Sequence, residues 1–259
     1  MKLIYLFSVL GLLYACNTTH KLNDNVIDEN IEFAYKQIGN EIQAIEKSGK
    51  FMNPVTLGKD GRTYYCKYTD WRSGFFPGSI WYLYELSGDP KLLPVAQKYT
   101  QALKEAQYLT WHHDIGFIIN NSYGNGYRLT GDTTYRSVIL QAAKSLQTRF
   151  RPVAGIIQSW DTKFGWQAER GWDCPVIIDN MILFEATRLS GDSVFHKIAV
   201  SHADRTLKEQ FKADGSCYHV VDYATGTGQV RSRQTAQGYS DESVWSRGHV
   251  FLFLQMDFG

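Results

Sequence analysis

Leu86-Ser87-Gly88-Asp89, Leu129-Thr130-Gly131-Asp132 and Leu189-Ser190-Gly191-Asp192 repeat one four-residue pattern along the chain. Each copy follows a helical stretch of sequence and precedes another. Glycine suits the left-handed position that ends a helix, and aspartate can accept backbone N–H groups at the start of the next helix. Pro90 fits the first copy, because proline is favoured at the first helical position. The pattern therefore predicts three antiparallel helical hairpins.

Other segments extend this helical pattern. Apolar residues recur at three- and four-residue steps between residues 26 and 45, after a polar start at residues 23–25, which predicts an amphipathic helix. A loop containing proline and glycine is expected at residues 54–61. A last helix is expected to start near Asp241, which makes about eight helices in all.

One segment departs from the helical pattern. Residues 216–221 and 229–233 flank Ala224-Thr225-Gly226-Thr227-Gly228, which predicts a β-hairpin. The helical hairpins are separated by long loops rich in glycine and aromatic residues, and their spacing is longer and less regular than that of a TPR array. The expected fold is therefore all-α, an α/α toroid whose site lies where the loops gather at one end.

Composition bounds the class of protein. The chain has 259 residues, 44% of them hydrophobic, and a formal net charge of +1. That is enough for one globular domain, expected over residues 17–259. Because there is no basic excess to neutralise phosphates, nucleic acid is not expected as a partner. The 7 Trp, 16 Tyr and 14 Phe favour a carbohydrate-binding protein only weakly, since most aromatic residues belong to a core.

The N-terminus has the features of an export signal. Lys2 precedes an apolar run from Leu3 to Ala15, which is shorter than the roughly 20 residues that span a bilayer. Leu13-Tyr14-Ala15-Cys16 resembles a bacterial lipobox. Residues 1–16 are therefore predicted to be a signal peptide, and Cys16 the lipidated first residue of a membrane-anchored lipoprotein facing the periplasm. Ordinary cleavage beside an incidental cysteine is the alternative.

The remaining cysteines carry no predicted chemistry. Cys66, Cys174 and Cys217 form no CxxC pair, so zinc binding and thiol redox activity have little support. They are expected to be small core residues.

Two aspartates are the strongest candidates for chemistry. Asp179 follows the apolar run from Pro175 to Ile178, and burial of this kind raises the pKa of a carboxyl group, as a general acid near neutral pH requires. Asp114 follows His112 and His113. Adjacent residues point in different directions, so no shared metal ion is expected there. From local sequence alone, a helix N-cap is the favoured interpretation of both aspartates.

Two further residues are ambiguous without more information. On a strand, His219 would share a face with Cys217 and Val221, where a histidine is more often a core residue. Arg247 can pair bidentately with a planar carboxylate such as that of a uronic acid. A salt bridge from Arg247 to Asp241, Glu242 or another acidic residue is an equal alternative.

Five motifs in order produce a specific resemblance. They are Trp71-Arg72-Ser73-Gly74-Phe75-Phe76-Pro77-Gly78, His112-His113-Asp114-Ile115-Gly116-Phe117, Ile156-Ile157-Gln158-Ser159-Trp160, Val176-Ile177-Ile178-Asp179-Asn180-Met181 and the run from Gln237 to Gly248. Together they resemble glycoside hydrolase family 88, the unsaturated glucuronyl hydrolases, from about residue 33 to residue 248. The resemblance implies an (α/α)6 barrel of twelve helices.

The resemblance also assigns roles to particular residues. Asp179 matches the catalytic acid/base, and Asp114 the second essential aspartate, which orients the substrate and tunes the acid. A further set matches substrate-contact positions: His219, Gln237, Arg247, His113, Trp71, Trp160, Trp245 and Ser243. For each tryptophan taken alone, core packing is the favoured interpretation.

The implied reaction differs from ordinary glycoside hydrolysis, in which two carboxylates flank the glycosidic bond. The partner is an oligosaccharide ending in a 4,5-unsaturated uronic acid. Asp179 would protonate C4 of the double bond while water adds at C5, and the hydrated sugar then releases its neighbour. No metal or organic cofactor is implied.

The sequence departs from the family pattern in two places. About one helical turn is missing after Met181, and the family continues beyond Gly248 through further helices, so a C-terminally truncated barrel is expected. The alternatives are an unsaturated rhamnogalacturonyl hydrolase of family 105 and a non-catalytic remnant that at most binds acidic sugar.

Overall fold

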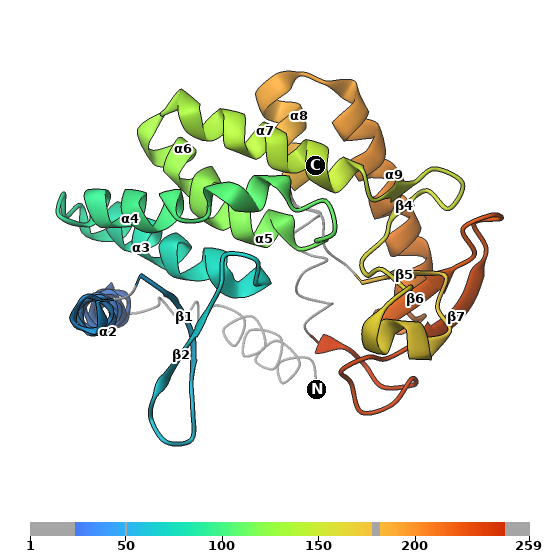
Figure 1. The fold of residues 1–259 in the computed structure, drawn as a ribbon, viewed down its shortest axis with the longest axis horizontal. Helices are drawn as coiled ribbons and strands as arrows, with labels where there is room; N and C mark the ends of the chain where they lie inside the picture. Colours follow the sequence, from blue (N-terminus) through green and yellow to red (C-terminus); the bar gives the residue numbers. More distant parts are fainter. Residues whose placement is uncertain (1–23, 50, 178–181, 247–259) are drawn as a thin grey trace, which may run out of the picture. The chain divides into compact units, whose positions relative to one another are not determined.

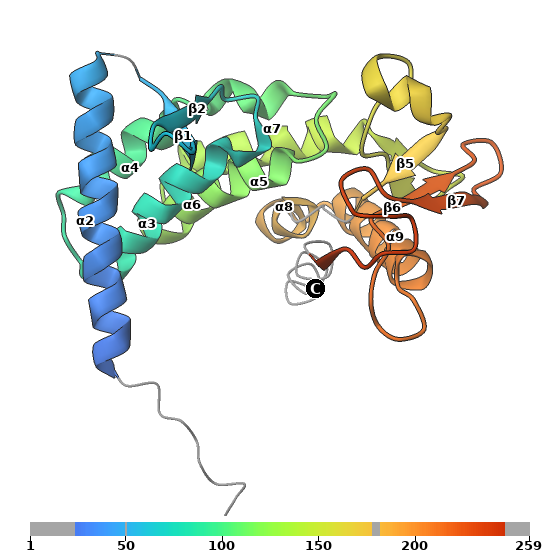
Figure 2. The same ribbon diagram turned by 90° about the horizontal axis from the view of Figure 1, so that it is seen from below.

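The computed structural model describes residues 24–49, 51–177 and 182–246. The chain divides into two units, Met1–Lys50 and Phe51–Gly259. In the first unit, α2 (Asp24–Ser48) is one uninterrupted helix, which confirms the amphipathic helix expected from residue 23 onward (Figure 2). Among the described residues, none of the helices combines the length and apolar character needed to cross a bilayer.

The second unit is built on the three predicted helical hairpins (Figure 1). The paired helices are α3 (Phe75–Ser87) with α4 (Leu92–Gln101), α6 (Asn125–Thr130) with α7 (Thr133–Gln147), and α8 (Ile182–Ser190) with α9 (Ser193–Gln210). Gly88, Gly131 and Gly191 have φ values of 65°, 69° and 72°, in the left-handed region that favours glycine. The helix-ending role predicted for all three glycines is confirmed.

The aspartate of each junction accepts the backbone N–H two residues later, as expected, in all three copies. Asp89 accepts from Lys91 at 2.9 Å, Asp132 from Thr134 at 2.9 Å and Asp192 from Val194 at 2.8 Å. The first copy differs only in where the helix begins, because α4 starts at Leu92 and Pro90 lies in the turn before it. The prediction that Pro90 occupies the first helical position is therefore wrong by two residues.

The hydroxyl residue of the junction also has a role. The side chains of Ser87, Thr130 and Ser190 each donate to the carbonyl four residues earlier and accept the N–H of the following aspartate. Each hydroxyl thereby satisfies one carbonyl of the last helical turn and one N–H beyond it. This explains why only Ser and Thr occupy the position.

Between the hairpins, the chain is less regular than its hydrophobic pattern predicts. The stretch expected to be one helix from Ile115 consists of α5 (Ile115–Ile119), a π-helical turn (Asn120–Gly124) and α6. Short 3₁₀ turns occur at Trp71–Gly74 (η1), Lys104–Tyr108 (η2) and Gly165–Arg170 (η4). The π turn adds a residue to the helical repeat and so rotates α6 relative to α5.

Three small antiparallel sheets accompany the helices. Their strands are β1 (Asn53–Leu57) with β2 (Thr63–Cys66), β3 (Phe150–Arg151) with β4 (Ile156–Ile157), and β5 (Cys174–Val176) with β6 (Val220–Tyr223) and β7 (Val230–Gln234). The predicted hairpin is confirmed as β6–β7, and β5 adds a third strand from more than forty residues earlier. The loop predicted at residues 54–61 is confirmed only for Gly58 and Gly61, which lie in the turn between β1 and β2, since Pro54 and Leu57 belong to β1.

The helix expected to start near Asp241 does not begin there, although Ser246 is helical. Residues 241–245 form turns, and the Asp241 carboxylate accepts the N–H of Thr235 at 2.8 Å instead of capping a helix. Residues 247–259 lie outside the described part. Eight α-helices, α2 to α9, are present in the described residues. That matches the expected number, but α5 and α6 count separately and the predicted last helix is not among them.

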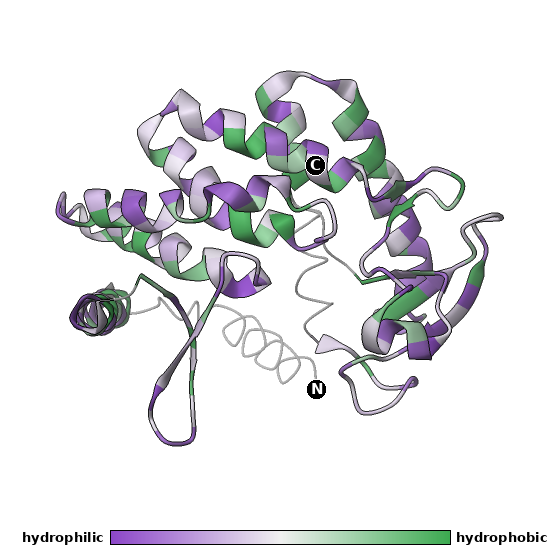
Figure 3. Cartoon of the chain, in the orientation of Figure 1, coloured by the Kyte–Doolittle hydropathy of each residue, from purple (hydrophilic) through white to green (hydrophobic). Residues whose placement is uncertain are grey.

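Apolar side chains line the contacts between these elements. Hydropathic colouring shows green and purple residues together along the longer helices, such as α7 and α9 (Figure 3). Cys174, Val176, Val221 and Tyr223 are fully buried in a cluster that joins β5 and β6. The expectation that Cys174 and Cys217 are core residues is confirmed, while Cys66 is only half-buried.

His202 joins helix α9 to strand β4 inside this core. Its side chain is 1% exposed, and its Nδ1 accepts the Ile157 N–H at 3.0 Å. Burial lowers the pKa of His202 to about 4, because the charged ring has lost its hydration.

We expect His202 to make the fold sensitive to mild acid. Between pH 6.5 and 4 the unfolded histidine binds a proton that the folded one does not, so stability falls as pH falls, by about 1.4 kcal/mol per pH unit for each such group. His202→Asn keeps an acceptor near Nδ1 and removes the titration. Urea unfolding from pH 7 to 4 should show a pH slope smaller by about one proton in the variant. An identical slope would contradict the assignment.

Candidate active site

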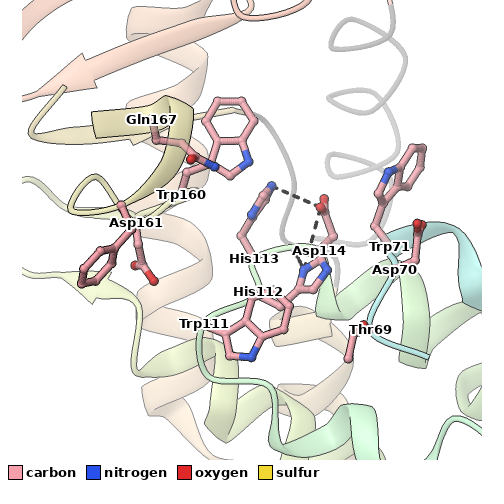
Figure 4. A pocket seen from close by; sticks show the side chains of 11 residues that line it. Thr69, Asp70, Trp71, Trp111, His112, His113, Asp114, Trp160, Asp161 and Gln167 are labelled. Carbon is pink, nitrogen blue, oxygen red and sulfur yellow. Dashed lines mark hydrogen bonds and ion pairs between the residues drawn. The ribbon is translucent and has the colours of Figure 1, made fainter. Parts of the chain in front are cut away.

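A cavity of about 530 Å³ opens where three loop segments meet in the second unit. Its described lining comes from residues 69–71, 111–114 and 160–167 (Figure 4). The first segment leads into η1, the second into α5, and the third follows β4. The expectation that loops gather to form a site is met by these three segments.

Asp114 lies at the centre of this cavity. It occupies the N-cap position of α5, but its carboxylate makes no capping hydrogen bond. Instead Oδ2 lies 3.2 Å from His113 Nε2 and 3.9 Å from His112 Nδ1 (Figure 4). The N-cap interpretation therefore holds for the backbone position and is wrong for the side chain.

The first turn of α5 packs closely against the backbone of η1. A Cβ atom on Gly74 would collide with the backbone of Phe117 and Ile118, so only glycine lets η1 lie directly against α5. Trp71, at the other end of η1, packs edge-on against the Phe117 ring at a centroid distance of 6.0 Å. These contacts place Trp71 and Asp114 on the same cavity.

The two histidines beside Asp114 do converge. Ligand atoms of His112, His113 and Asp114 all lie within 4.8 Å of one another, so the argument that adjacent residues point apart is wrong here. The rings are nevertheless engaged. His112 Nδ1 accepts the Asp114 N–H at 3.1 Å, and its ring also bonds the Thr69 backbone. His112, His113 and Asp114 are therefore linked to one another and to the backbone by hydrogen bonds and close contacts. That they bind no metal ion stays a prediction.

His113 is held between a backbone carbonyl and the Asp114 carboxylate. Its ring is 6% exposed and hydrogen bonds the Ser159 carbonyl. Burial lowers the pKa of His113 to about 4, although Asp114 opposes that shift. A neutral ring that donates one N–H to Ser159 has only a lone pair on the other nitrogen. The His113 Nε2 atom lies 3.2 Å from Asp114 Oδ2, close enough to form an ion pair when the ring is protonated.

Aromatic rings form the opposite wall. Trp160 meets the His113 ring edge-on at 5.7 Å and stacks on Trp172 at 5.7 Å with planes 13° apart. Trp166 packs edge-on against Trp160 at 5.3 Å. Core packing was the favoured interpretation for each tryptophan alone, but Trp160 and Trp71 line the cavity.

His219 is connected to this wall rather than to the cavity itself. Its ring lies edge-on to Trp160 at 6.2 Å and stacks on Trp245 at 4.0 Å with planes 18° apart. Nδ1 accepts the N–H groups of Ala236 and Gln237 at 3.0 and 3.3 Å. Because Nδ1 is thus an acceptor, the neutral ring carries its proton on Nε2.

The remaining predicted residues fall into two groups. Gln237 is exposed and is fixed here through its backbone, and Ser243 donates its hydroxyl to the Ser240 carbonyl at 2.6 Å within a turn. Neither lines the described cavity. Asp179, Arg247 and Cys16 lie outside the described residues, so their predicted roles stay predictions.

The chain segment before Asp179 is buried and is hydrogen bonded to Ser159. Cys174, Pro175 and Val176 are buried, as the apolar run predicted. Ser159 holds this strand, because its N–H donates to the Pro175 carbonyl at 2.9 Å and its Oγ accepts the Ile177 N–H at 2.8 Å. Ser159 thus connects the segment before Asp179 to the His113–Asp114 pair.

Several cavity residues were not predicted. Trp111 is 53% exposed beside His112, and Phe164 is 79% exposed at the cavity mouth. Asp161 and Gln167 also line it. The only sequence signal was the density of aromatic residues around 160–172, which a search for charged motifs overlooks.

The chain is similar in sequence to known enzymes. An unsaturated glucuronyl hydrolase from Formosa agariphila is 37% identical over 96% of this chain and 64% of its own length. An unsaturated chondroitin disaccharide hydrolase from Streptococcus agalactiae is 28% identical over 87% of this chain and 56% of its own length. No family model matches the chain.

Solved structures give the same result. The crystal structure of an unsaturated glucuronyl hydrolase specific for heparin has a TM-score of 0.79 and 38% identity, covering 87% of this chain and 59% of that one. The enzyme from Streptococcus agalactiae has a TM-score of 0.78 and 28% identity, covering 92% and 62%. The chain thus spans less than two thirds of the relatives it matches.

These structural neighbours show the fold class of the chain. They are (α/α)6 barrels, so the helical hairpins seen here are part of an α/α toroid, as predicted. Within that class, the chain is a homologue of the unsaturated glucuronyl hydrolases, glycoside hydrolase family 88, over most of its own length.

We expect Ser159→Ala to loosen the site and to destabilise the fold. Without Oγ, the Ile177 N–H loses its acceptor in a poorly hydrated place, which costs about 1 to 3 kcal/mol. Urea unfolding measures this loss. Ser137→Ala, on the exposed face of α7, is the matched control and should change stability by less than about 0.5 kcal/mol. Equal effects of the two substitutions would contradict the role of Ser159.

Proposed function

We propose that the protein containing this chain removes the 4,5-unsaturated uronic acid from the non-reducing end of oligosaccharides produced by lyases. The observation that carries the proposal is the Asp114 carboxylate, held by His113 in a cavity whose walls include Trp71 and Trp160 (Figure 4). Tryptophan faces suit the apolar faces of a sugar ring, and carboxylate and imidazole groups can hydrogen bond its hydroxyl groups. The relatives named above support this reaction class.

The proposed chemistry is hydration of the C4=C5 double bond. Asp179 donates a proton to C4, a water molecule adds its oxygen to C5, and the surplus proton of that water returns to the carboxylate. The product is a hemiketal at C5, which opens to a ketone and releases the neighbouring sugar. Asp114 orients the substrate while His113 holds the Asp114 carboxylate in place.

The proposed substrates are glycosaminoglycan-type disaccharides. One structural neighbour is specific for heparin, and one sequence relative is a chondroitin disaccharide hydrolase. A uronate also carries a carboxylate, for which Arg247 supplies a bidentate partner in the proposal.

The reaction can be followed directly, because hydration removes the ultraviolet absorbance of the C4=C5 enol ether. Purified protein should lower that absorbance with unsaturated chondroitin or heparin disaccharides, and much less with unsaturated rhamnogalacturonan disaccharides. Asp179→Asn and Asp114→Asn should each lower kcat by about 100-fold or more. Asp204→Asn, an exposed acid on α9, is the control and should retain wild-type kcat. Constant absorbance with the glycosaminoglycan substrates, or full activity of Asp179→Asn, would refute the proposal.

We also propose that the protein is exported and anchored to a membrane through a lipid on Cys16. The support is the sequence alone, a short apolar run followed by Leu13-Tyr14-Ala15-Cys16. This placement would expose the cavity to oligosaccharides in the periplasm.

Growth with a radioactive fatty acid tests the anchor. The wild-type protein should carry the label in the membrane fraction, and Cys16→Ser should carry none. Cys66→Ser is the control for a cysteine of the folded unit and should stay labelled. Label that persists in Cys16→Ser would show that Cys16 is not the site.

A further inference from the structure

A second cavity lies beside the first. It has a volume of about 430 Å³ and is lined by Thr110, Trp111, Thr148, Arg149, Arg151 and Asp161. Trp111 and Asp161 belong to the walls of both cavities. A chain of sugars that begins in the first cavity can therefore pass along the half-exposed Trp111 ring into the second.

The Arg149 side chain, which lines this cavity, is buried and held by several hydrogen bonds. It is 3% exposed, and its guanidinium donates to the carbonyls of Thr110, Gln158 and Ser159 at 2.8 to 3.2 Å. Asp161 is its ion-pair partner at 3.2 Å, but that side chain is 56% exposed. The exposed carboxylate compensates the buried charge poorly, because water screens it.

Arg151 adds a second positive charge to the same cavity. Its Nε donates to Gln158 Oε1 at 2.9 Å, and its Nη1 donates to the Thr148 carbonyl at 3.3 Å. Within the described part of the chain, no carboxylate pairs with Arg151. Burial lowers the pKa of Arg149, and the charge of Arg151 lowers it further, while Asp161 opposes both effects. Two arginines and one aspartate leave the lining with a net charge of +1.

A structural role accounts for Arg149 only in part. Its three carbonyl acceptors tie the loop before α5 to the loop after β4. Arg151 also bonds Gln158, but its positive charge beside Arg149 raises the electrostatic energy of the cavity. An anion in this cavity would lower it, and the N–H groups that Arg149 and Arg151 do not use internally can donate to the oxygens of a sulfate or carboxylate group.

We propose that this second cavity, the Arg149–Arg151 subsite, binds an anionic group on the sugars that follow the unsaturated uronic acid. The inference rests on the proposed function, since the first cavity must hold the uronic acid. The anion is either a sulfate on the adjoining hexosamine or the carboxylate of the next uronic acid. Because Arg149 is already immobilised, binding there loses little side-chain entropy.

The test compares pairs of substrates that differ in one anionic group. One pair is the unsaturated chondroitin disaccharide with and without a sulfate on its hexosamine. The other is the unsulfated disaccharide and the unsulfated tetrasaccharide, which adds a carboxylate. For each pair the ratio of kcat/KM measures the selectivity for the extra charge.

Arg151→Gln should lower one of these ratios about tenfold, mainly through KM, since a charge-assisted hydrogen bond is lost. A fall for the sulfated pair identifies the sulfate, and a fall for the longer substrate identifies the carboxylate. Asp161→Asn removes the competing negative charge and should raise the same ratio. Arg188→Gln, an exposed arginine paired with Glu185 on α8, is the matched control and should leave both ratios unchanged.

The outcomes separate the subsite from the reaction itself. If the wild type hydrolyses the disaccharides and neither Arg151→Gln nor Asp161→Asn changes a ratio, the subsite is refuted and the proposed function stands. If Arg151→Gln does not fold, an unchanged ratio in Asp161→Asn refutes the subsite. If the wild type hydrolyses nothing, the proposed function fails, and ratios of dissociation constants for the same pairs decide on the subsite alone.

Discussion

The hydrogen bonds of one serine hold the candidate site together. Ser159 is 1% exposed, and its N–H and Oγ fix the strand that leads toward Asp179. Its carbonyl accepts from His113 and from Arg149 Nη2, the latter at 3.2 Å. A carbonyl has two lone pairs, so both donors can be satisfied at once. Three segments far apart in sequence thereby meet at one buried residue, where an unsatisfied polar group would be costly.

This constraint explains why the cavity has defined walls although loops build it. Asp114 depends on His113, and His113 in turn depends on the Ser159 carbonyl. Trp160 follows Ser159 directly, so the aromatic wall moves only if the serine moves. Loops that carry a site need such support, because a misplacement of about 1 Å can cost about a hundredfold in rate. Here the support is polar and buried, and the flanking helices α5 and α7 supply the apolar packing.

The sequence predicted the features that depend on local chemistry. The three Gly-Asp junctions, α2 and the β6–β7 hairpin follow from capping, periodicity and turn residues, and all are confirmed. The failures involve distant partners. Asp114 has the local signature of an N-cap, but its carboxylate turns to His113, whose own partner lies 46 residues later. Strand β5 needs β6 beside it, and Trp111 and Asp161 become cavity residues only when two loops meet.

The same carbonyl also links the walls of the two cavities. Ser159 O accepts from the Arg149 guanidinium, which lines the second cavity, and from the His113 ring, which lines the first. Burial lowers the pKa of His113 most, and the nearby charges of His112 and Arg149 lower it further, while Asp114 opposes the shift. A displacement of Ser159 would therefore disturb a cation of one cavity and a histidine of the other at the same time.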